Sequence, residues 1–181
     1  RGLGDVYKRQ GMPDTLVYNL NENKNDYNDD YQSRGEYVNY LRGAPFGPNK
    51  DRYASGLGIP IDLSLAFHTD AGITRNDTTI GTLLIYSIED ADSNFVFPDG
   101  MSRIANRDLA DIVQSQIVDD IRAKYDPAWS RRALREAQYS EAFRPNVPGI
   151  LLELLSHQNF LDMKFMLEPR FRFDVARSIY K

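Results

Sequence analysis

Residues 149–155 read GILLELL, an apolar run that carries one charged residue, Glu153. Short apolar runs of this length are typical of strands that are buried in a sheet. A carboxylate without a partner is costly to bury, so we expect Glu153 to be paired, to have a raised pKa, or to face a cleft. The alternative is that the alternation of the strand turns Glu153 to solvent at an edge of the sheet. The local spacing leaves both interpretations open.

Two further apolar runs precede this stretch and predict strands. Residues 61–67 (IDLSLAF) alternate in polarity and lie between Pro60 and a stretch of turn-forming residues at 68–72. Their length and their boundaries favour a buried strand. Residues 80–88 (IGTLLIYSI) have the same character and predict a second strand.

Apolar side chains at three- and four-residue spacing predict several helices. The longest is expected to begin at an N-cap, Ser102, and to end before Pro127. Shorter helices are predicted over residues 35–41, 160–167 and 170–180.

The order of these elements predicts the fold class. Strands interleaved with helices are typical of an α/β domain, which we expect to have three layers (α/β/α) around a mostly parallel, mixed and twisted sheet. Residues 20–33 are rich in Asn and Asp and are predicted to form a loop. Residues 129–139 are compatible with a helix by propensity or with an edge strand by position.

The composition excludes several classes of protein. The chain has 181 residues, with 22 Lys and Arg against 26 Asp and Glu, so its formal charge is 22 − 26 = −4. The absence of cysteine excludes a disulfide scaffold, a cysteine nucleophile and a thiolate metal site. No apolar run in the sequence approaches the roughly 20 residues that span a bilayer. The acidic balance makes nucleic acid a poor candidate partner.

The start of the chain is expected to be foreign to the protein. Residues 5–10 (DVYKRQ) resemble a translated sequencing adapter, and such segments are excluded from reasoning about the fold. No methionine precedes Met12. We therefore interpret residues 11–181 as part of the domain of a longer protein.

The two histidines are candidates for chemistry, because imidazole is a common metal ligand and an acid or base near neutral pH. His68 follows the predicted strand at residues 61–67, and sites in α/β sheets gather at the carboxyl ends of strands. A structural, hydrogen-bonded histidine is the alternative at that position. His157 lies in a sequence that resembles a helix-capping turn before Phe160, where a structural role is favoured.

Two motifs resemble those of a known family. Residues 147–153 (VPGILLE) match residue for residue the Val-Pro-x-x-Leu-x-Glu strand of the zinc-dependent N-acetylmuramoyl-L-alanine amidases that have a phosphorylase/hydrolase-like fold. Residues 68–71 (HTDA) resemble the His-x-Asn-Ala motif of that family, with Asp70 in place of the usual Asn. Ser156 and Asn159 approximate the Ser-Asn turn that follows the Glu strand, with two residues inserted.

The resemblance extends over residues 31–181, since Arg34 and Asn39 are similar to an Arg and an Asn of the family's preceding helix. It implies that His68 is one of three protein ligands of a zinc ion and that Glu153 is the acid/base carboxylate. A catalytic zinc lowers the pKa of its bound water, and a neighbouring carboxylate takes the proton and passes it to the leaving amine.

The family also implies a substrate and a location. The bond cut is the amide between the lactyl group of N-acetylmuramic acid and the first L-alanine of the peptidoglycan stem, so the expected partner is a muropeptide. The expected location is the periplasm or the outside of a bacterial cell. The oligomeric state has no signature in the sequence.

Two further ligands of the family have no counterpart in this sequence. They are a His in a Gly-His-Gly type motif and a Glu downstream of it, and residues 11–67 contain no His. Either the chain starts after these ligands, so that the domain is incomplete at its N-terminus, or it is a degenerate, non-hydrolytic relative. In both cases we expect this polypeptide not to hold zinc tightly, because one His supplies too few ligands.

Two other functions are open at this stage. One is a related zinc amidase or peptidase that acts on a different amide. The other is a non-catalytic module that binds cell wall or glycan and has kept the fold without the metal.

Overall fold

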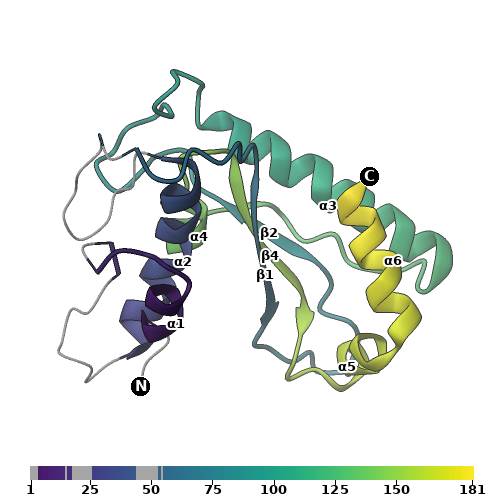
Figure 1. Cartoon of the computed structure of the whole chain (residues 1–181). Coiled ribbons are helices and arrows are strands. Elements are labelled where there is room, and N and C mark those ends of the chain that lie inside the picture. The colour runs from purple at the N-terminus through teal and green to yellow at the C-terminus, as the bar shows by residue number, and fades with distance from the viewer. Residues whose placement is uncertain (1–3, 15, 18–25, 44–52, 54) are drawn as a thin grey trace.

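The computed structural model describes residues 4–14, 16–17, 26–43, 53 and 55–181. Its helices and strands form three layers, with a mixed sheet between two layers of helices (Figure 1). The α/β class and the layered arrangement expected from the sequence are therefore confirmed.

The sheet has four strands in the order β1-β4-β2-β3. They are β1 (Ser64–Asp70), β2 (Leu83–Tyr86), β3 (Arg135–Glu136) and β4 (Gly149–Ser156). β1 pairs with β4 and β2 with β3 in parallel, whereas β2 and β4 are antiparallel. The sheet is thus mixed, with more parallel than antiparallel pairs, as the sequence predicts.

β4 is the interior strand that the GILLELL stretch predicts. Along its length every residue is buried except Glu153, which is partly exposed. Because β4 lies between β1 and β2, the alternative that placed Glu153 on an edge strand is wrong.

The strand predicted over residues 61–67 differs from the strand that forms. β1 begins and ends three residues later and includes His68, because its pairing with β4 runs from Ser64 opposite Gly149 to Asp70 opposite Ser156. β1 lies at the end of the strand order, so one of its edges is unpaired among the described strands. The side chains of Leu65 and Phe67 are 38% and 48% exposed, and the expectation of a buried strand is therefore wrong.

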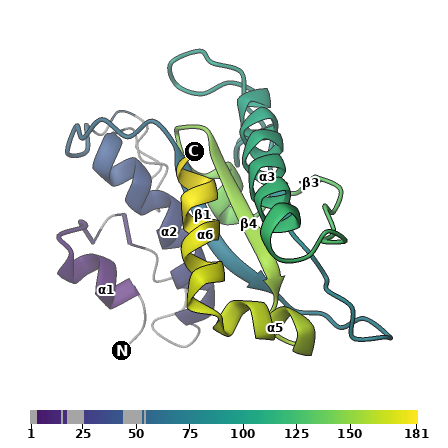
Figure 2. The ribbon, with the colours of Figure 1, turned by 90° about the vertical axis from the view of Figure 1, so that its right-hand side faces the viewer.

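Helices cover both faces of the sheet (Figures 1 and 2). α3 (Ile104–Lys124) and α6 (Pro169–Tyr180) pack on one face, with α5 (Phe160–Leu167) leading into α6. The main core lies under these helices and includes Leu84, Ile117, Trp129, Leu152, Leu155 and Phe171. Of the described helices, none is long and apolar enough to cross a membrane.

The opposite face carries α2 (Asp26–Arg42) and α4 (Ser140–Phe143). The loop predicted over residues 20–33 is wrong for its second part, since α2 begins at Asp26; residues 20–25 lie outside the described residues. Local propensity is outweighed by tertiary contacts, because Glu36 of α2 pairs with Arg144, and Asn39 accepts a hydrogen bond from the Asn146 backbone N–H at 2.7 Å.

Three other boundaries differ from the predictions. α3 begins at Ile104 with Arg103 in the capping position, although the Ser102 hydroxyl still accepts from the Ile104 N–H at 3.3 Å. Residues 129–139 are mostly irregular and contribute only the two-residue edge strand β3. The short helix α4 had no counterpart among the predicted elements.

The described residues 4–14 and 16–17 pack against α2. α1 (Gly4–Arg9) places the Tyr7 ring 5.6 Å from the ring of Tyr37, and Met12 and Leu16 join the same small apolar cluster. This cluster is separate from the main core.

Candidate active site

His68 and Glu153 are direct partners in the pairing of β1 with β4. Residues that are paired in register on parallel strands point to the same face of a sheet, here the face that carries α2 and α4. Both side chains line one pocket, so 85 positions of separation along the chain are closed by a single strand pair. The sheet thereby brings the two predicted site residues together.

The pocket is built by α2, β1, β4 and the segment that leads into α4. Its lining combines two carboxylates, an imidazole and a guanidinium with tyrosines of α2 and of the segment before α4. The lining residues are Tyr27, Tyr31, Arg34, His68, Gln138, Tyr139, Ser140, Glu141, Leu151 and Glu153.

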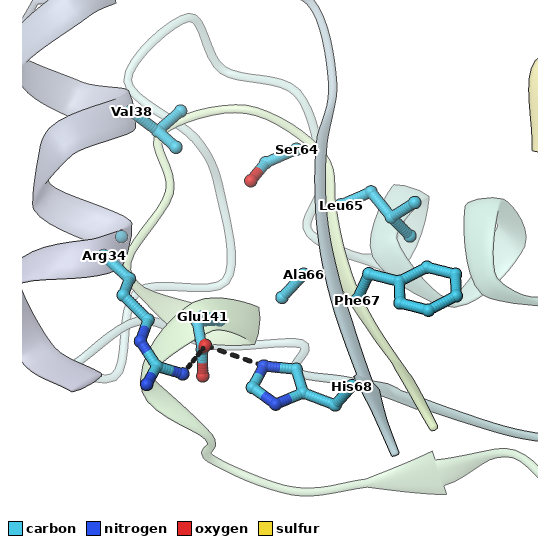
Figure 3. A pocket seen from close by; sticks show the side chains of 9 residues that line it. Arg34, Val38, Ser64, Leu65, Ala66, Phe67, His68 and Glu141 are labelled. Carbon is cyan, nitrogen blue, oxygen red and sulfur yellow. Dashed lines mark hydrogen bonds and ion pairs between the residues drawn. The ribbon is translucent and has the colours of Figure 1, made fainter. Parts of the chain in front are cut away.

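A second pocket lies beside the first, along β1 and α2 (Figure 3). The figure shows Arg34 of α2 directed towards Glu141 and His68, with Glu141 between the two, and Val38 of α2 on the side of Ser64. Leu65 and Phe67 point to the other side of β1. Arg34, His68 and Glu141 line both pockets and therefore lie where the two meet.

Glu141 binds His68 and Arg34 through the same oxygen atom. Its Oε1 lies 2.9 Å from His68 Nε2 and accepts a hydrogen bond from Arg34 Nη1 at 2.7 Å (Figure 3). Arg34 also donates to the carboxylate of Asp30, one turn earlier on α2. The result is a chain of charged groups that joins α2, α4 and β1.

These contacts shift the pKa values of all three groups. The hydrogen bond to Glu141 raises the pKa of His68, against burial, which lowers it. Burial would raise the pKa of Glu141, but hydrogen bonds from His68 and Arg34 outweigh burial and hold that pKa below its usual value. Burial would lower the pKa of Arg34, because Arg34 is a cation, but its hydrogen bonds to Asp30 and Glu141 outweigh burial and raise this pKa. Each interaction favours the charged form of its partners.

Glu153 is in a different state from Glu141. Burial raises the pKa of Glu153, and the nearby charge of His68 lowers it by less. Its Oε2 is buried and has no hydrogen-bond partner among the residues that the structure describes. A carboxyl group with a raised pKa in a pocket is suited to take up and release a proton, which is the property that acid/base catalysis needs.

Asp70, which stands where the family has Asn, binds Arg132. The Arg132 Nη1 donates to Asp70 Oδ2 at 2.6 Å, and the Ala71 backbone N–H donates to Asp70 Oδ1. Burial would raise the pKa of Asp70, but these hydrogen bonds outweigh it and lower the pKa. Asp70 is thus a paired anion near the pocket, and the charge of Arg132 is partly neutralised.

The remaining predicted residues lie outside the pocket. His157 Nδ1 lies 3.2 Å from Thr69 Oγ1 at the exposed end of β1, as expected of a structural histidine. Asn159 caps α5, because its side chain accepts from the Asp162 N–H at 2.9 Å. Asn39 fixes α2 to the segment before β4, through hydrogen bonds to the backbone of Arg144 and Asn146.

Sequence reasoning missed Glu141 and the tyrosines Tyr27 and Tyr31. Glu141 has no motif around it, and its partners Arg34 and His68 are 107 and 73 positions away. The tyrosines fall in the stretch that was predicted as a loop, although Tyr27 and Tyr31 have the i, i+4 spacing that places them on one face of a helix. That spacing was the available signal.

The donor set matches part of a zinc site. His68, Glu141 and Glu153 are of the residue types that bind zinc, but the described residues contain no group of three arranged to hold a metal ion. His68 Nε2 is also engaged by Glu141. Among the described residues, His68 could therefore serve as one ligand of a zinc site, but the site is not complete.

No family model matches the chain, and no curated protein matches it. Solved structures do. The CwlD amidase of Clostridioides difficile, in complex with the GerS lipoprotein, has a TM-score of 0.56 at 14% identity over 97% of this chain and 76% of that chain. The amidase Ami1 of Mycobacterium smegmatis has a TM-score of 0.52 at 17% identity, over 82% of this chain and 56% of its own.

A third solved structure is the catalytic domain of CwlV, an N-acetylmuramoyl-L-alanine amidase from Bacillus (Paenibacillus) polymyxa var. colistinus. Its TM-score is 0.52 at 13% identity, over 82% of this chain and 60% of that one. The match spans 53% of the length of a solved N-acetylmuramoyl-L-alanine amidase from Clostridium difficile 630 and 76% of that of CwlD. The chain therefore has the fold of solved amidases, as the motifs implied.

Proposed function

We propose that this chain is part of a zinc-dependent N-acetylmuramoyl-L-alanine amidase, in which Glu153 is the acid/base and His68 is a metal ligand. The substrate is the amide between N-acetylmuramic acid and the first L-alanine of the peptidoglycan stem. The protein acts on the cell wall, in the periplasm or outside the cell. The likeness in fold to solved amidases supports the reaction class.

The observation that carries the proposal is the register of β1 against β4. It sets the His68 imidazole beside the Glu153 carboxyl in a pocket, and these are the two residues that the motifs single out. A mere likeness of fold would not require that two motif residues, far apart in sequence, become strand partners.

The chain's own residues divide the work as follows. Glu153, whose pKa is raised by burial, takes a proton from the attacking water and later gives it to the departing amine. The tyrosines that line the pocket, Tyr27, Tyr31 and Tyr139, present flat surfaces against which a muropeptide can pack.

Zinc would supply the activated water, and its other ligands belong to a part of the longer protein that this sequence does not include. The match spans 56–76% of the length of the solved CwlD, Ami1 and CwlV amidases, which supports that assignment. We propose that residues 11–181 are the partial catalytic domain and that residues 1–10 derive from an adapter.

The test is hydrolysis of purified muropeptides by the longer protein, followed by mass spectrometry of the products. We expect release of a free N-terminal L-alanine peptide, which stops on chelation and returns with zinc. Glu153→Gln is expected to lower kcat by about 10²- to 10⁴-fold, the usual contribution of an acid/base residue. His157→Gln is the matched control, because His157 lies outside the pocket.

Other outcomes would separate the alternatives. Zinc-dependent cleavage of a different amide, with muropeptide intact, would favour the related amidase or peptidase. Binding of peptidoglycan without cleavage, unchanged in Glu153→Gln, would favour the non-catalytic module and contradict the proposal.

A further inference from the structure

We propose that Glu141 is a positioning residue for His68: with Arg34 it fixes the imidazole as the tautomer protonated at Nε2 and leaves Nδ1 as the free nitrogen. The tautomer of the neutral ring follows from its contact with an ionised carboxylate, whereas its meaning for catalysis rests on the proposed function.

The hydrogen bond between Glu141 and His68 can run in only one direction when the carboxyl group is ionised. Glu141 Oε1 lies 2.9 Å from His68 Nε2 and accepts from Arg34 Nη1 as well. An ionised carboxylate only accepts, so the hydrogen in the contact with His68 must be carried by Nε2. A neutral imidazole that donates through Nε2 has its lone pair on Nδ1.

Glu141 is buried, and its pairing with Arg34 keeps it ionised and in place. Glu141 is 8% exposed, and a carboxylate buried to this extent requires partners. Arg34 is that partner, and it is itself fixed by Asp30 on the preceding turn of α2. Arg34 and Asp30 belong to α2 and Glu141 belongs to α4, so the ring of His68 is held from outside its own strand, β1. Figure 3 shows Glu141 between Arg34 and His68.

The pair of His68 and Glu141 resembles a metal-binding histidine with the carboxylate that orients it. Histidines that bind a metal through one ring nitrogen almost always donate the other N–H to a carboxylate, a carbonyl or a water, which sets the tautomer and the orientation of the ring. Glu141 occupies that place relative to His68. Glu153 does not occupy such a place, because its buried Oε2 has no hydrogen-bond partner among the described residues. The two glutamates therefore have separate tasks.

The test is the tautomer of His68, measured by long-range ¹H–¹⁵N NMR on the metal-free 181-residue chain. The hydrogen bond to Glu141 raises the pKa of His68, so the pH must lie above this raised pKa for the imidazole to be neutral, which a pH titration of the His68 signals establishes. The chain has two histidines, and His157→Gln assigns their signals. We expect the Nε2–H tautomer at His68 in the wild type; the Nδ1–H tautomer there would overturn the proposal without any further variant.

Three substitutions complete the test. Glu141→Ala should give a mixture of tautomers, whereas Glu141→Gln should retain Nε2–H, because Oε1 alone accepts both hydrogen bonds and the amide carbonyl keeps that acceptor. Glu136→Ala removes an exposed carboxylate of β3 and should leave the His68 signals unchanged. An Nε2–H tautomer that persists in folded Glu141→Ala would contradict the role of Glu141.

The catalytic reading has a separate readout in the longer protein. Removing the carboxylate behind a metal ligand typically costs 10- to 100-fold in metal affinity or activity, so Glu141→Ala should weaken zinc binding by that factor with little change in KM. A longer protein that hydrolyses no muropeptide would refute the proposed function and leave the tautomer result standing. Full zinc affinity in Glu141→Ala would refute the positioning role alone.

Discussion

Glu153 is a partly exposed carboxyl group in a strand whose other residues are all buried. The free energy of such a group depends on its charge, because burial penalises the ionised form and leaves the neutral form almost unaffected. Arg132 lies near enough to lower the pKa of Glu153, yet its nearest carboxylate is Asp70. Glu153 is therefore a group that is kept less ionised than an ordinary glutamate at the same pH.

The pH dependence of stability tests this description. The folded-state pKa of Glu153 is raised above the ordinary value of 4.5, so its contribution is fully present below that value and is lost as the pH rises through the folded pKa. Glu153→Gln removes this loss. In urea unfolding of the metal-free chain, the free energy of unfolding of the variant minus that of the wild type should increase from pH 4 to pH 8. A difference that is constant over this range would show that the carboxyl group is not desolvated.

At this scale the sequence predicts some residues and not others. His68 and Glu153 can be found because each belongs to a short motif, and the charge in GILLELL is anomalous by itself. Glu141 cannot, because its importance comes from a contact with β1 and α2 that exists only after the chain has folded. Asp70 is a departure from the motif whose partner, Arg132, lies 62 positions away.

Among the elements, β2 depends on a close approach at its start. Gly81 has φ = 84°, and a Cβ there would lie 2.2 Å from the Ser130 carbonyl oxygen. That contact accompanies the hydrogen bond from the Thr82 N–H to the same carbonyl, which leads the chain into β2. Only a residue without a Cβ fits both the backbone conformation and the space.

Gly81→Ala is therefore expected to destabilise the protein by more than the cost of φ alone. Gly100 has a similar φ of 87° with nothing within 4 Å of an added Cβ, so Gly100→Ala measures that cost, roughly 1–2 kcal/mol. Urea unfolding should give a clearly larger loss for Gly81→Ala. Equal losses for the two variants would mean that the approach of Ser130 is not needed for the fold.

The accuracy of the predicted elements follows from where their stability comes from. β4, α5 and α6 are predicted well, because their signals are local. β4 is an apolar run, and each of the two helices follows directly on a capping residue, with Pro169 at the start of α6. The first half of α2 was missed because its long-range contacts are made with residues more than 100 positions later, Gln32 with Arg144 and Arg34 with Glu141. The position of β1 was missed because the strand's limits are set by β4.

At the scale of the whole molecule, the main core contains an aromatic centre between the sheet, α3 and α6. The Trp129 indole is completely buried and donates to Thr82 Oγ1 at 2.9 Å, and its ring lies 5.8 Å from that of Phe171. Phe171 in turn packs edge-on against Tyr125 at 5.2 Å. Through these rings α6, the last helix, is joined to β2 and α3.

Phe171→Ala should lower the free energy of unfolding by about 3–5 kcal/mol, because it leaves a cavity in this centre. Phe173, two residues along the same helix, is 68% exposed. Phe173→Ala should therefore change the free energy of unfolding by less than about 0.5 kcal/mol. Chemical denaturation of both variants provides the measurement. A small effect of Phe171→Ala would indicate that α6 is not part of the cooperative unit.

The sheet in this chain sets the two proposed catalytic groups side by side, but zinc needs three protein ligands in a catalytic site, and the described residues offer one imidazole. We therefore expect the 181-residue chain to bind zinc more weakly than micromolar in isothermal titration calorimetry. His68→Ala should change that weak binding little in this chain and should abolish tight binding in the longer protein, where the remaining ligands are expected. Micromolar or tighter binding by the short chain, lost in His68→Ala, would mean that a complete site already exists here and that no ligand from elsewhere is required.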